Sequence, residues 1–143
     1  IAGDRIALHA EDVQQLQLPQ LARCMYTSNF IDLAPQHVEF WAQNKREAYV
    51  ILDSVARNLQ PGAPLFIHKQ QPKRPGPHFT LRAQHEITGD QLTTTYFYQD
   101  DVLTINRKRT KTIMERESFQ QELAQRGIRH LKETKHWHVY RKD

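Results

Sequence analysis

Two segments of the chain gather positively charged side chains with almost no carboxylates among them. One runs from Lys69 to Arg74 and the other from Arg107 to Lys111. Clustered cations raise the local electrostatic potential and attract polyanions. Contacts to phosphates give an affinity that falls with salt but read little base sequence. Together with cations near the end of the chain, the predicted phosphate-contacting residues are Lys69, Lys73, Arg74, Arg107, Lys108, Arg109, Lys111, Arg126, Arg129, Lys132 and Lys135.

The composition is that of a small globular protein with a basic excess. The chain has 143 residues, of which 38% are hydrophobic and 25% charged, and its net charge is +4. This size and this composition fit one domain that buries a single core. We therefore predict a single α+β domain over residues 1–143. Because the chain begins with Ile1 rather than Met, we expect it to be excised from a larger protein.

The number of cysteines and the hydropathy of the sequence limit the cellular compartments in which the protein is expected. Cys24 is the single cysteine of the sequence, which excludes an intrachain disulfide and a thiolate metal cluster. A lone cysteine fits a reducing compartment, so we predict a cytoplasmic protein. No apolar run approaches the roughly 20 residues of a membrane span, and the first residues have no apolar core of a signal peptide. No membrane partner is predicted.

Helical spacing of apolar residues predicts the amino-terminal half. Two short helices broken at Pro19 are expected first. A long helix then begins with Asp32 as its cap and ends at the NLQPG segment, residues 58–62. Its apolar stripe consists of Val38, Trp41, Ala48, Leu52, Val55 and Leu59. This helix should be the main apolar surface against which a sheet packs.

The second half changes to the period of strands. The APLFIH segment, residues 63–68, reads as a short strand, and alternation in FTLRAQHEI, QLTTTYFY and VLTIN predicts an antiparallel meander after a proline-rich basic loop. Helical spacing resumes at Thr110 and stops at Gly127, with a closing strand from His130 to Tyr140. The predicted fold class is α+β, with amino-terminal helices and one long amphipathic helix packed on a β-meander and a carboxyl-terminal helix–strand ending.

The helix SFQQELAQRG followed by a strand resembles the closing part of winged-helix domains. The resemblance implies a helix in the major groove and a wing on the backbone, with Gln120, Gln121 and Gln125 reaching base edges. The leading prediction is therefore a nucleic-acid-binding module within a larger DNA-handling protein, with DNA favoured over RNA. No cofactor, metal or catalytic residue is predicted, and a binding module is favoured over an enzyme.

Two other functions remain open. Apolar residues beyond the helix stripe, such as Phe40 and Ile51, would suit a protein-interaction or assembly module. The third candidate is a metal-dependent enzyme that cleaves phosphodiesters with His78 and the pair His136 and His138. The pair resembles the metal-binding histidines of rolling-circle nucleases, and the segment from His78 is similar to the His-x-Thr element of two-histidine phosphodiesterases.

Two further patterns in the sequence bear on function. His37-Val38-Glu39 resembles the His-x-Glu of zinc deaminases, but no paired cysteines follow, so that chemistry is excluded. The aromatic residues Tyr96 and Tyr98 could stack bases on a sheet. Strand alternation places both on one face and Phe97 on the other, so these three residues cannot serve one role.

Overall fold

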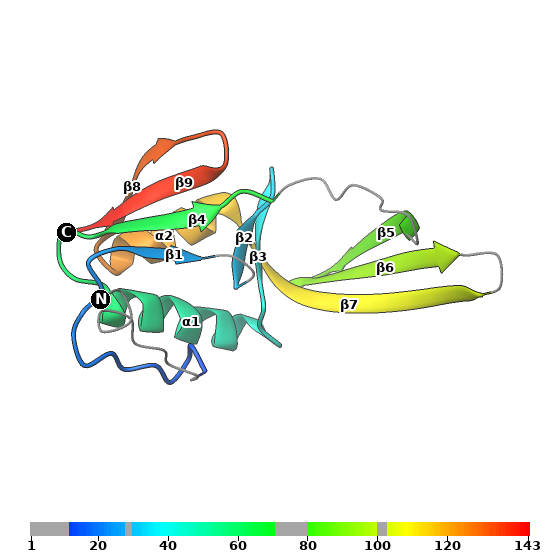
Figure 1. Cartoon of the computed structure of the whole chain (residues 1–143), viewed down its shortest axis with the longest axis horizontal. Helices are drawn as coiled ribbons and strands as arrows, with labels where there is room; N and C mark the ends of the chain where they lie inside the picture. The colour runs from blue at the N-terminus through cyan, green and yellow to red at the C-terminus, as the bar shows by residue number, and fades with distance from the viewer. Residues whose placement is uncertain (1–11, 28–29, 71–79, 100–102) are drawn as a thin grey trace, which may run out of the picture.

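The computed structural model describes residues 12–27, 30–70, 80–99 and 103–143, which form two sheets and two helices (Figure 1). The elements are β1 (Met25–Thr27), β2 (Ile31–Leu33), β3 (His37–Phe40), α1 (Lys45–Asn58), β4 (Pro64–His68), β5 (Thr80–Thr88), β6 (Gln91–Gln99), β7 (Thr104–Glu115), α2 (Arg116–Gln125), β8 (Ile128–Glu133) and β9 (Trp137–Lys142).

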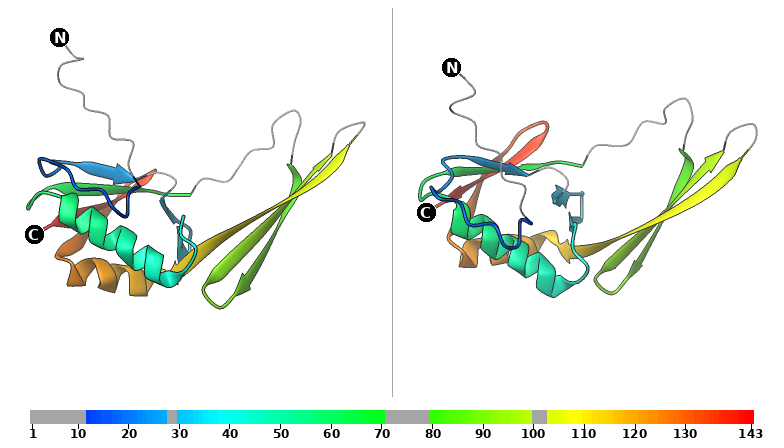
Figure 2. Two further views of the ribbon diagram at one scale, coloured as in Figure 1. Left: turned by 90° about the horizontal axis from the view of Figure 1, so that it is seen from below. Right: turned by 60° about the horizontal axis from the view of Figure 1, so that its bottom comes forward.

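The first sheet has four strands in the order β1-β4-β9-β8. β1 and β4 are parallel neighbours, and the chain between them contains α1, so they form a crossover unit. β9 pairs antiparallel with both β4 and β8. Both helices lie on the same side of this sheet (Figure 2). The sheet is therefore mixed, with its parallel pair at one edge.

The second sheet has five strands in the order β2-β3-β7-β6-β5, all antiparallel. Strand β7 is 12 residues long and joins two environments. Its last residues pair with β3 and include the buried Thr112 and Met114, whereas the stretch from Thr104 to Lys108 is exposed and pairs with β6. The three strands β5, β6 and β7 project from the body of the molecule (Figures 1 and 2).

One hydrophobic core joins both sheets to the helices. Phe40 of β3 meets Phe119 of α2 with ring centroids 5.9 Å apart, and Phe119 meets Tyr140 of β9 at 6.0 Å. All three rings are buried. Ile51 and Leu52 of α1 belong to the same core. The base of the five-stranded sheet is thereby fixed to the body, and we call the side that carries Phe40 its core face.

The predicted long helix is wrong in its first half. Helix α1 begins at Lys45, where Asn44 Oδ1 accepts a hydrogen bond from the Glu47 amide at 3.0 Å and caps the helix. Asp32, expected to be the cap, lies in β2. Val38, expected on the helix, lies in β3. The helix was predicted too long because apolar residues of a strand and of the turn after it can also be three to four residues apart. The predicted end of the helix, at Asn58, is confirmed.

The predicted fold class is also wrong. Among the described residues, the structure has nine strands and only two helices, α1 and α2. The segment around Cys24, predicted to be helical, leads into β1. The ending is not a winged helix, because Ile113 and Met114 belong to β7 and the closing strand is a hairpin of β8 and β9. The meander of β5, β6 and β7 and the short strand β4 are present as expected.

The described segments contain no helix that is both long enough and apolar enough to cross a membrane.

Candidate functional site

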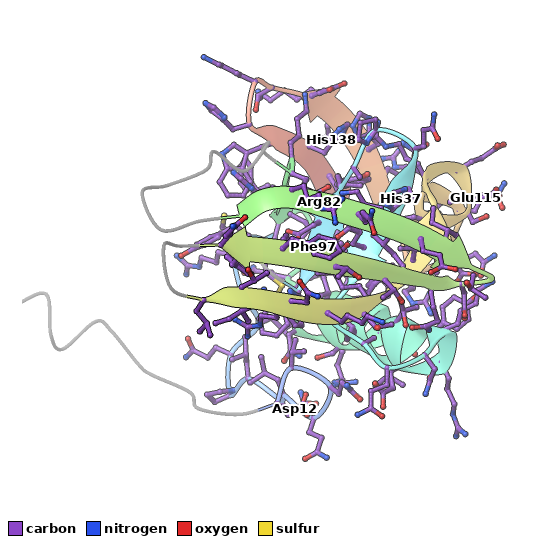
Figure 3. All side chains as sticks on the ribbon, turned by 90° about the vertical axis from the view of Figure 1, so that its right-hand side faces the viewer. Asp12, His37, Arg82, Phe97, Glu115 and His138 are labelled. Atoms are coloured by element: carbon purple, nitrogen blue, oxygen red, sulfur yellow. The ribbon has the colours of Figure 1, made fainter. Side chains whose placement is uncertain are left out.

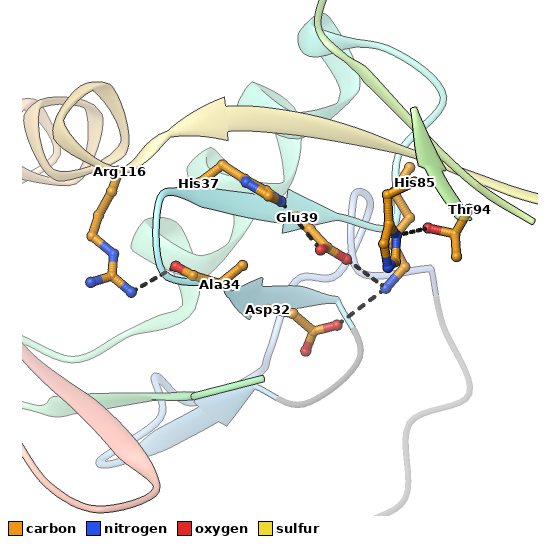
Figure 4. Close-up of polar contacts among 8 residues, drawn as sticks. Asp32, Ala34, His37, Glu39, His85, Thr94 and Arg116 are labelled. Carbon is orange, nitrogen blue, oxygen red and sulfur yellow. Dashed lines mark hydrogen bonds and ion pairs between the residues drawn. The ribbon is translucent and has the colours of Figure 1, made fainter. Parts of the chain in front are cut away.

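Side chains that could do chemistry gather where β7 passes β3. Lys111 Nζ lies 3.1 Å from Glu39 Oε2 and 3.4 Å from Asp32 Oδ2 (Figure 4). Asp32 and Glu39 are cross-strand partners on β2 and β3. They point to the face of the sheet opposite Val38 and Phe40, since neighbouring residues of a strand alternate. We call this the site face.

Cross-strand register places one set of side chains on the site face. Starting from Glu39, partners on neighbouring strands share a face, and so do residues two positions apart. Strand by strand, the site face includes Asp32 of β2, His37 and Glu39 of β3, Ile113, Lys111, Arg109, Arg107 and Ile105 of β7, Leu92, Thr94, Tyr96 and Tyr98 of β6, and Ile87, His85 and Ala83 of β5. On the other side, Arg82 lies over the ring of Phe97 at 4.1 Å, and both are labelled in Figure 3.

Burial explains why the cluster at the base is paired. Glu39 is only 5% exposed, and a carboxylate removed from water needs a cation or hydrogen-bond donors. Lys111 supplies the ammonium, and His37 lies on the other carboxylate oxygen, with Nε2 3.3 Å from Glu39 Oε1. Two carboxylates face one ammonium group here. The base of the site face therefore has a formal excess of one negative charge, before the His37 ring is counted.

The contact with Glu39 orients the His37 ring. A carboxylate can only accept a hydrogen bond, so the proton of a neutral ring must lie on Nε2. The second nitrogen, Nδ1, is then the acceptor. Carboxylate-oriented imidazoles of this kind accept protons from ligands. The pair thus has the arrangement of a general base.

Two further groups extend the polar surface of the site face. His85 Nδ1 lies 3.0 Å from Thr94 Oγ1 on the neighbouring strand (Figure 4). Trp41, which follows β3, has Lys111 Nζ 5.1 Å from its ring centroid and the Arg109 guanidinium carbon at 5.8 Å. The indole therefore holds two cations in place near the carboxylates.

The cluster also lies close in sequence to the carboxyl end of a parallel strand. In open α/β sheets, ligands bind outside the carboxyl ends of parallel strands. β1 ends at Thr27, four residues before β2 begins. The hydroxyl oxygen of Thr27 is buried and has no hydrogen-bond partner among the described residues. A group that would satisfy this hydroxyl has to come from outside the described part of the chain.

A second polar cluster lies on β8 and β9. His138 is 3% exposed, and burial lowers its pKa. Its Nδ1 lies 3.1 Å from His130 Nε2 and its Nε2 lies 3.7 Å from Glu133. A hydrogen bond from Lys69 lowers the pKa of Glu133. In the part of the chain that the structure covers, no three His, Cys, Asp or Glu side chains are arranged to hold a metal ion.

An open groove of about 610 Å³ lies beside Trp41. Its polar walls are engaged within the protein, since Glu47 accepts the Gln43 amide and Gln91 donates to the Gln43 carbonyl. The groove is lined by Asp12, Gln14, Trp41, Ala42, Gln43, Glu47, Gln91 and Thr110. We therefore place the candidate site on the site face rather than in this groove.

The cations predicted to contact phosphate are dispersed. Lys69 is paired with Glu133, Lys111 with Asp32 and Glu39, and Arg129 with Asp143. Arg126 bonds Asp53 at 2.6 Å and Glu122 at 2.8 Å. Arg107 and Arg109 lie on the site face and Lys108 on the opposite face, while Lys132 lies on β8 and Lys135 in the turn after it. Lys73, Arg74 and His78 lie outside the described residues.

The carboxylates and the histidine at the base of the site are not among the site residues predicted from the sequence. The sequence pattern predicts Asp32 as a helix cap, and the lack of paired cysteines excludes a zinc site at His37 and Glu39. The available signal was alternation: in QHVEF, the polar His37 and Glu39 point to one face and the apolar Val38 and Phe40 to the other. That pattern indicates a strand with a polar face, and a polar face next to a strand end is a place for a site.

Solved structures share this arrangement of elements. CalS10, an amino pentose methyltransferase from Micromonospora echinaspora solved with S-adenosylmethionine (SAM), matches 93% of this chain with a TM-score of 0.60 and 12% identity. The sugar N-methyltransferase KedS8 from a Streptoalloteichus species matches 99% at 0.57 and 16% identity. The CcbJ methyltransferase from Streptomyces caelestis matches 92% at 0.63 and 11% identity.

This chain spans only part of those proteins: 63% of CalS10, 65% of KedS8 and 62% of CcbJ. No family model matches the sequence, and no curated protein matches it.

The predicted function is contradicted by these neighbours. They are methyltransferases, one of them solved with SAM and two of them named for work on sugars, and nothing among them indicates a nucleic-acid partner. The prediction of a DNA-binding, winged-helix-like module is therefore wrong. The two alternatives, an interaction module and a phosphodiester-cleaving enzyme, are contradicted as well. Charge clustered along the sequence is a weak indicator of a phosphate-binding surface, because several of these cations are paired with carboxylates in the fold. The fold of this chain is similar to that of these methyltransferases over most of its own length.

Proposed function

We propose that this chain is the acceptor-binding portion of a larger SAM-dependent methyltransferase that acts on a small polar molecule carrying an amino group. The observation that carries the proposal is the likeness to methyltransferase structures over 92–99% of the chain, projecting sheet included. Two of those proteins are named for amino pentose and sugar N-methylation. Because the fold alone does not define a substrate, the choice of an amine rests on the site face.

The base of the site face suits a cationic amine. Asp32 and Glu39 together outnumber the one ammonium of Lys111, so an incoming ammonium is attracted. Asp32 is the more accessible of the two carboxylates, with 15% of its side chain exposed against 6% for Glu39. We assign Asp32 to contact the amine and Glu39 to orient His37. An amine becomes a nucleophile once its ammonium form loses a proton, and the Nδ1 atom of a neutral His37 ring can accept it.

The described residues do not form a complete site for SAM. In Rossmann-type folds a glycine-rich turn between a strand and a helix cradles the nucleotide. The described glycines with left-handed backbone are Gly62 after α1, Gly89 between β5 and β6, and Gly127 after α2. None of these three turns joins a strand to the start of a helix. We therefore place the cradle for the cofactor outside the described residues.

Transfer of a labelled methyl group tests the proposal. The full-length protein that contains this chain is given SAM with a labelled methyl group and matched pairs of small molecules, an amino sugar and the sugar with a hydroxyl group in its place. We expect label in the amino compound alone. Asp32→Asn should lower kcat/KM for the amino sugar about tenfold or more, because a charge-assisted contact is lost.

A control and a second variant keep the test decisive. Lys132→Gln, on the exposed strand β8, should leave the rate unchanged. Glu39→Gln should move the pH dependence of the rate, since it alters the partner of His37. Folding of each variant is checked by circular dichroism. Label in neither sugar, or equal label in both, would reject an amine-directed methyltransferase.

A further inference from the structure

The projecting part of the site face is cationic, unlike its base. Arg107 and Arg109 occupy alternate positions of β7, so both point to the site face about 7 Å apart along the strand. Lys111, the next position, is engaged by the carboxylates. Among the described site-face positions from Ala83 to Ile87, Leu92 to Tyr98 and Ile105 to Arg109, no side chain is acidic. The two guanidinium groups thus lie on a surface without nearby carboxylates of the same face.

Two tyrosines stand beside these arginines. Tyr96 is the direct cross-strand partner of Arg107, and Tyr98 is the next residue on the same face. Their ring centroids are 6.2 Å apart with an angle of 37° between the planes. Both rings are partly buried although the hairpins project into solvent. They form an aromatic surface adjoining a guanidinium, which suits a ligand that carries an apolar or planar part next to an anionic group.

Charge on the site face is therefore separated along its length. The carboxylates Asp32 and Glu39 lie at the base, and Arg107 and Arg109 lie toward the tip, with Lys111 between. A molecule with charge of only one sign would be attracted at one end and repelled at the other. A molecule with a cationic end and an anionic end matches both, and it can bind in one orientation only.

We propose that Arg107 and Arg109 form a subsite for an oxyanion, a phosphate or carboxylate group carried by the same small molecule whose amine lies at Asp32. This inference rests on the proposed function, and it names the acceptor as a molecule with separated positive and negative groups. Guanidinium groups bind such oxyanions through paired hydrogen bonds, and the donors of Arg107 and Arg109 provide two forks. Tyr96 and Tyr98 contact the part of the ligand next to the oxyanion.

The neighbouring residue on the strand provides a matched control. Lys108 lies between the two arginines in sequence and points to the opposite face, as partner of Thr95. Substitution of Lys108 changes the net charge of the hairpin as much as substitution of either arginine does. A surface that attracts anions only through its total charge responds equally to all three changes, whereas a subsite responds to the two arginines alone.

The experiment measures binding of inorganic pyrophosphate and of succinate to the full-length protein that contains this chain, by isothermal titration calorimetry. Pyrophosphate represents the phosphate source and succinate the carboxylate source. We expect saturable binding of at least one probe. Arg107→Gln and Arg109→Gln should each weaken it about tenfold or more, as for the loss of a hydrogen bond between charged groups, while Lys108→Gln changes it less than twofold. Arg107→Lys should fall between, because the charge remains and the fork is lost.

Two outcomes overturn the subsite: no saturable binding of either probe, or an effect of Lys108→Gln equal to that of Arg107→Gln. Failure here is distinct from failure of the proposed function. If methyl transfer to the amine persists in Arg107→Gln with unchanged KM, only the oxyanion subsite is rejected. If the probes bind as expected but no amine is methylated, the methyltransferase proposal fails by itself.

Discussion

Lys111 and Glu39 are 72 residues apart in the chain, and their side chains meet at 3.1 Å where β7 passes β3. The contact fixes the register of the long strand against the base of its sheet. Asp32, on the next strand, holds the same ammonium group from another side. One partly buried lysine thus ties three strands together at the place where the site face begins.

Replacement of Lys111 by Met should therefore destabilise the fold. The methionine side chain is nearly as long as that of lysine, but it leaves Glu39, which is 5% exposed, without its cation. Removal of one partner from a buried ion pair costs roughly 3–5 kcal/mol. Urea unfolding followed by circular dichroism measures the loss. Lys132→Met, an exposed position of β8, is the control and should change the free energy of unfolding by less than about 0.5 kcal/mol. Equal effects of the two substitutions would show that the cluster has no structural weight.

His138 should make stability depend on pH in the mildly acidic range. Burial lowers the pKa of His138 from the ordinary 6.5, although the nearby Glu133 opposes the shift. The native state therefore holds the ring neutral while the unfolded chain binds a proton, so stability is complete above about pH 6.5 and falls as the pH drops toward the lowered value.

The measurement is the free energy of unfolding of the protein at a series of pH values between about 5 and 8. His138→Gln should flatten the slope below pH 6.5, and Lys132→Gln should leave it in place. The charged or titratable groups that face His138 are Glu133, Arg116, His130 and Lys69, and none of them is altered in this comparison. An identical slope in His138→Gln would assign the dependence to other groups.

Tyr140 should make the stability of the protein depend on pH in the alkaline range. Burial raises the pKa of Tyr140 to about 12. An unfolded tyrosine ionises near pH 10, so the stability that the neutral ring contributes is present below about pH 10 and is lost as the pH rises toward 12. Ultraviolet difference absorbance of the five tyrosines should show one that ionises only in strong alkali, and Tyr140→Phe should remove that phase. If the late phase persists in Tyr140→Phe, another tyrosine is responsible.

The sequence predicted those elements whose evidence is local. Alternation with a turn at Gly89 is enough to specify the β5–β6 hairpin, and the Gly62 segment ends α1 as expected. The prediction from the sequence was wrong at β7, because that strand passes from solvent into the core. Asn106 to Thr110 are polar on both faces, and Ile113 and Met114 then place apolar residues on both. A strand that changes environment loses its two-residue period, and helical spacing fits it by chance.

The candidate site could not be predicted from the sequence for a different reason. The partners of Lys111 lie in β2 and β3, and Arg126 binds Asp53 of α1, so these ion pairs depend on contacts far apart in the chain. Charge counted along the sequence cannot distinguish a cation held by carboxylates from one that is available to a ligand. Only the pairing register of β7 shows that Lys108 points to the opposite face from Arg107 and Arg109. The same register places Lys111 beside β3, where carboxylates bind it.

Gly127 offers a direct test of the turn that carries the chain from α2 into β8. Its φ is +75°, and its amide donates to the Ala124 carbonyl at 3.0 Å, which ends the helix. A methyl group at this position would meet no atom within 4 Å, so only backbone strain opposes it. Left-handed backbone costs a residue with a β-carbon about 1–2 kcal/mol, and Asn tolerates it better. Gly127→Ala should therefore lower the midpoint of thermal unfolding more than Gly127→Asn does. If both variants unfold at the wild-type temperature, the left-handed turn contributes nothing to the stability of the ending.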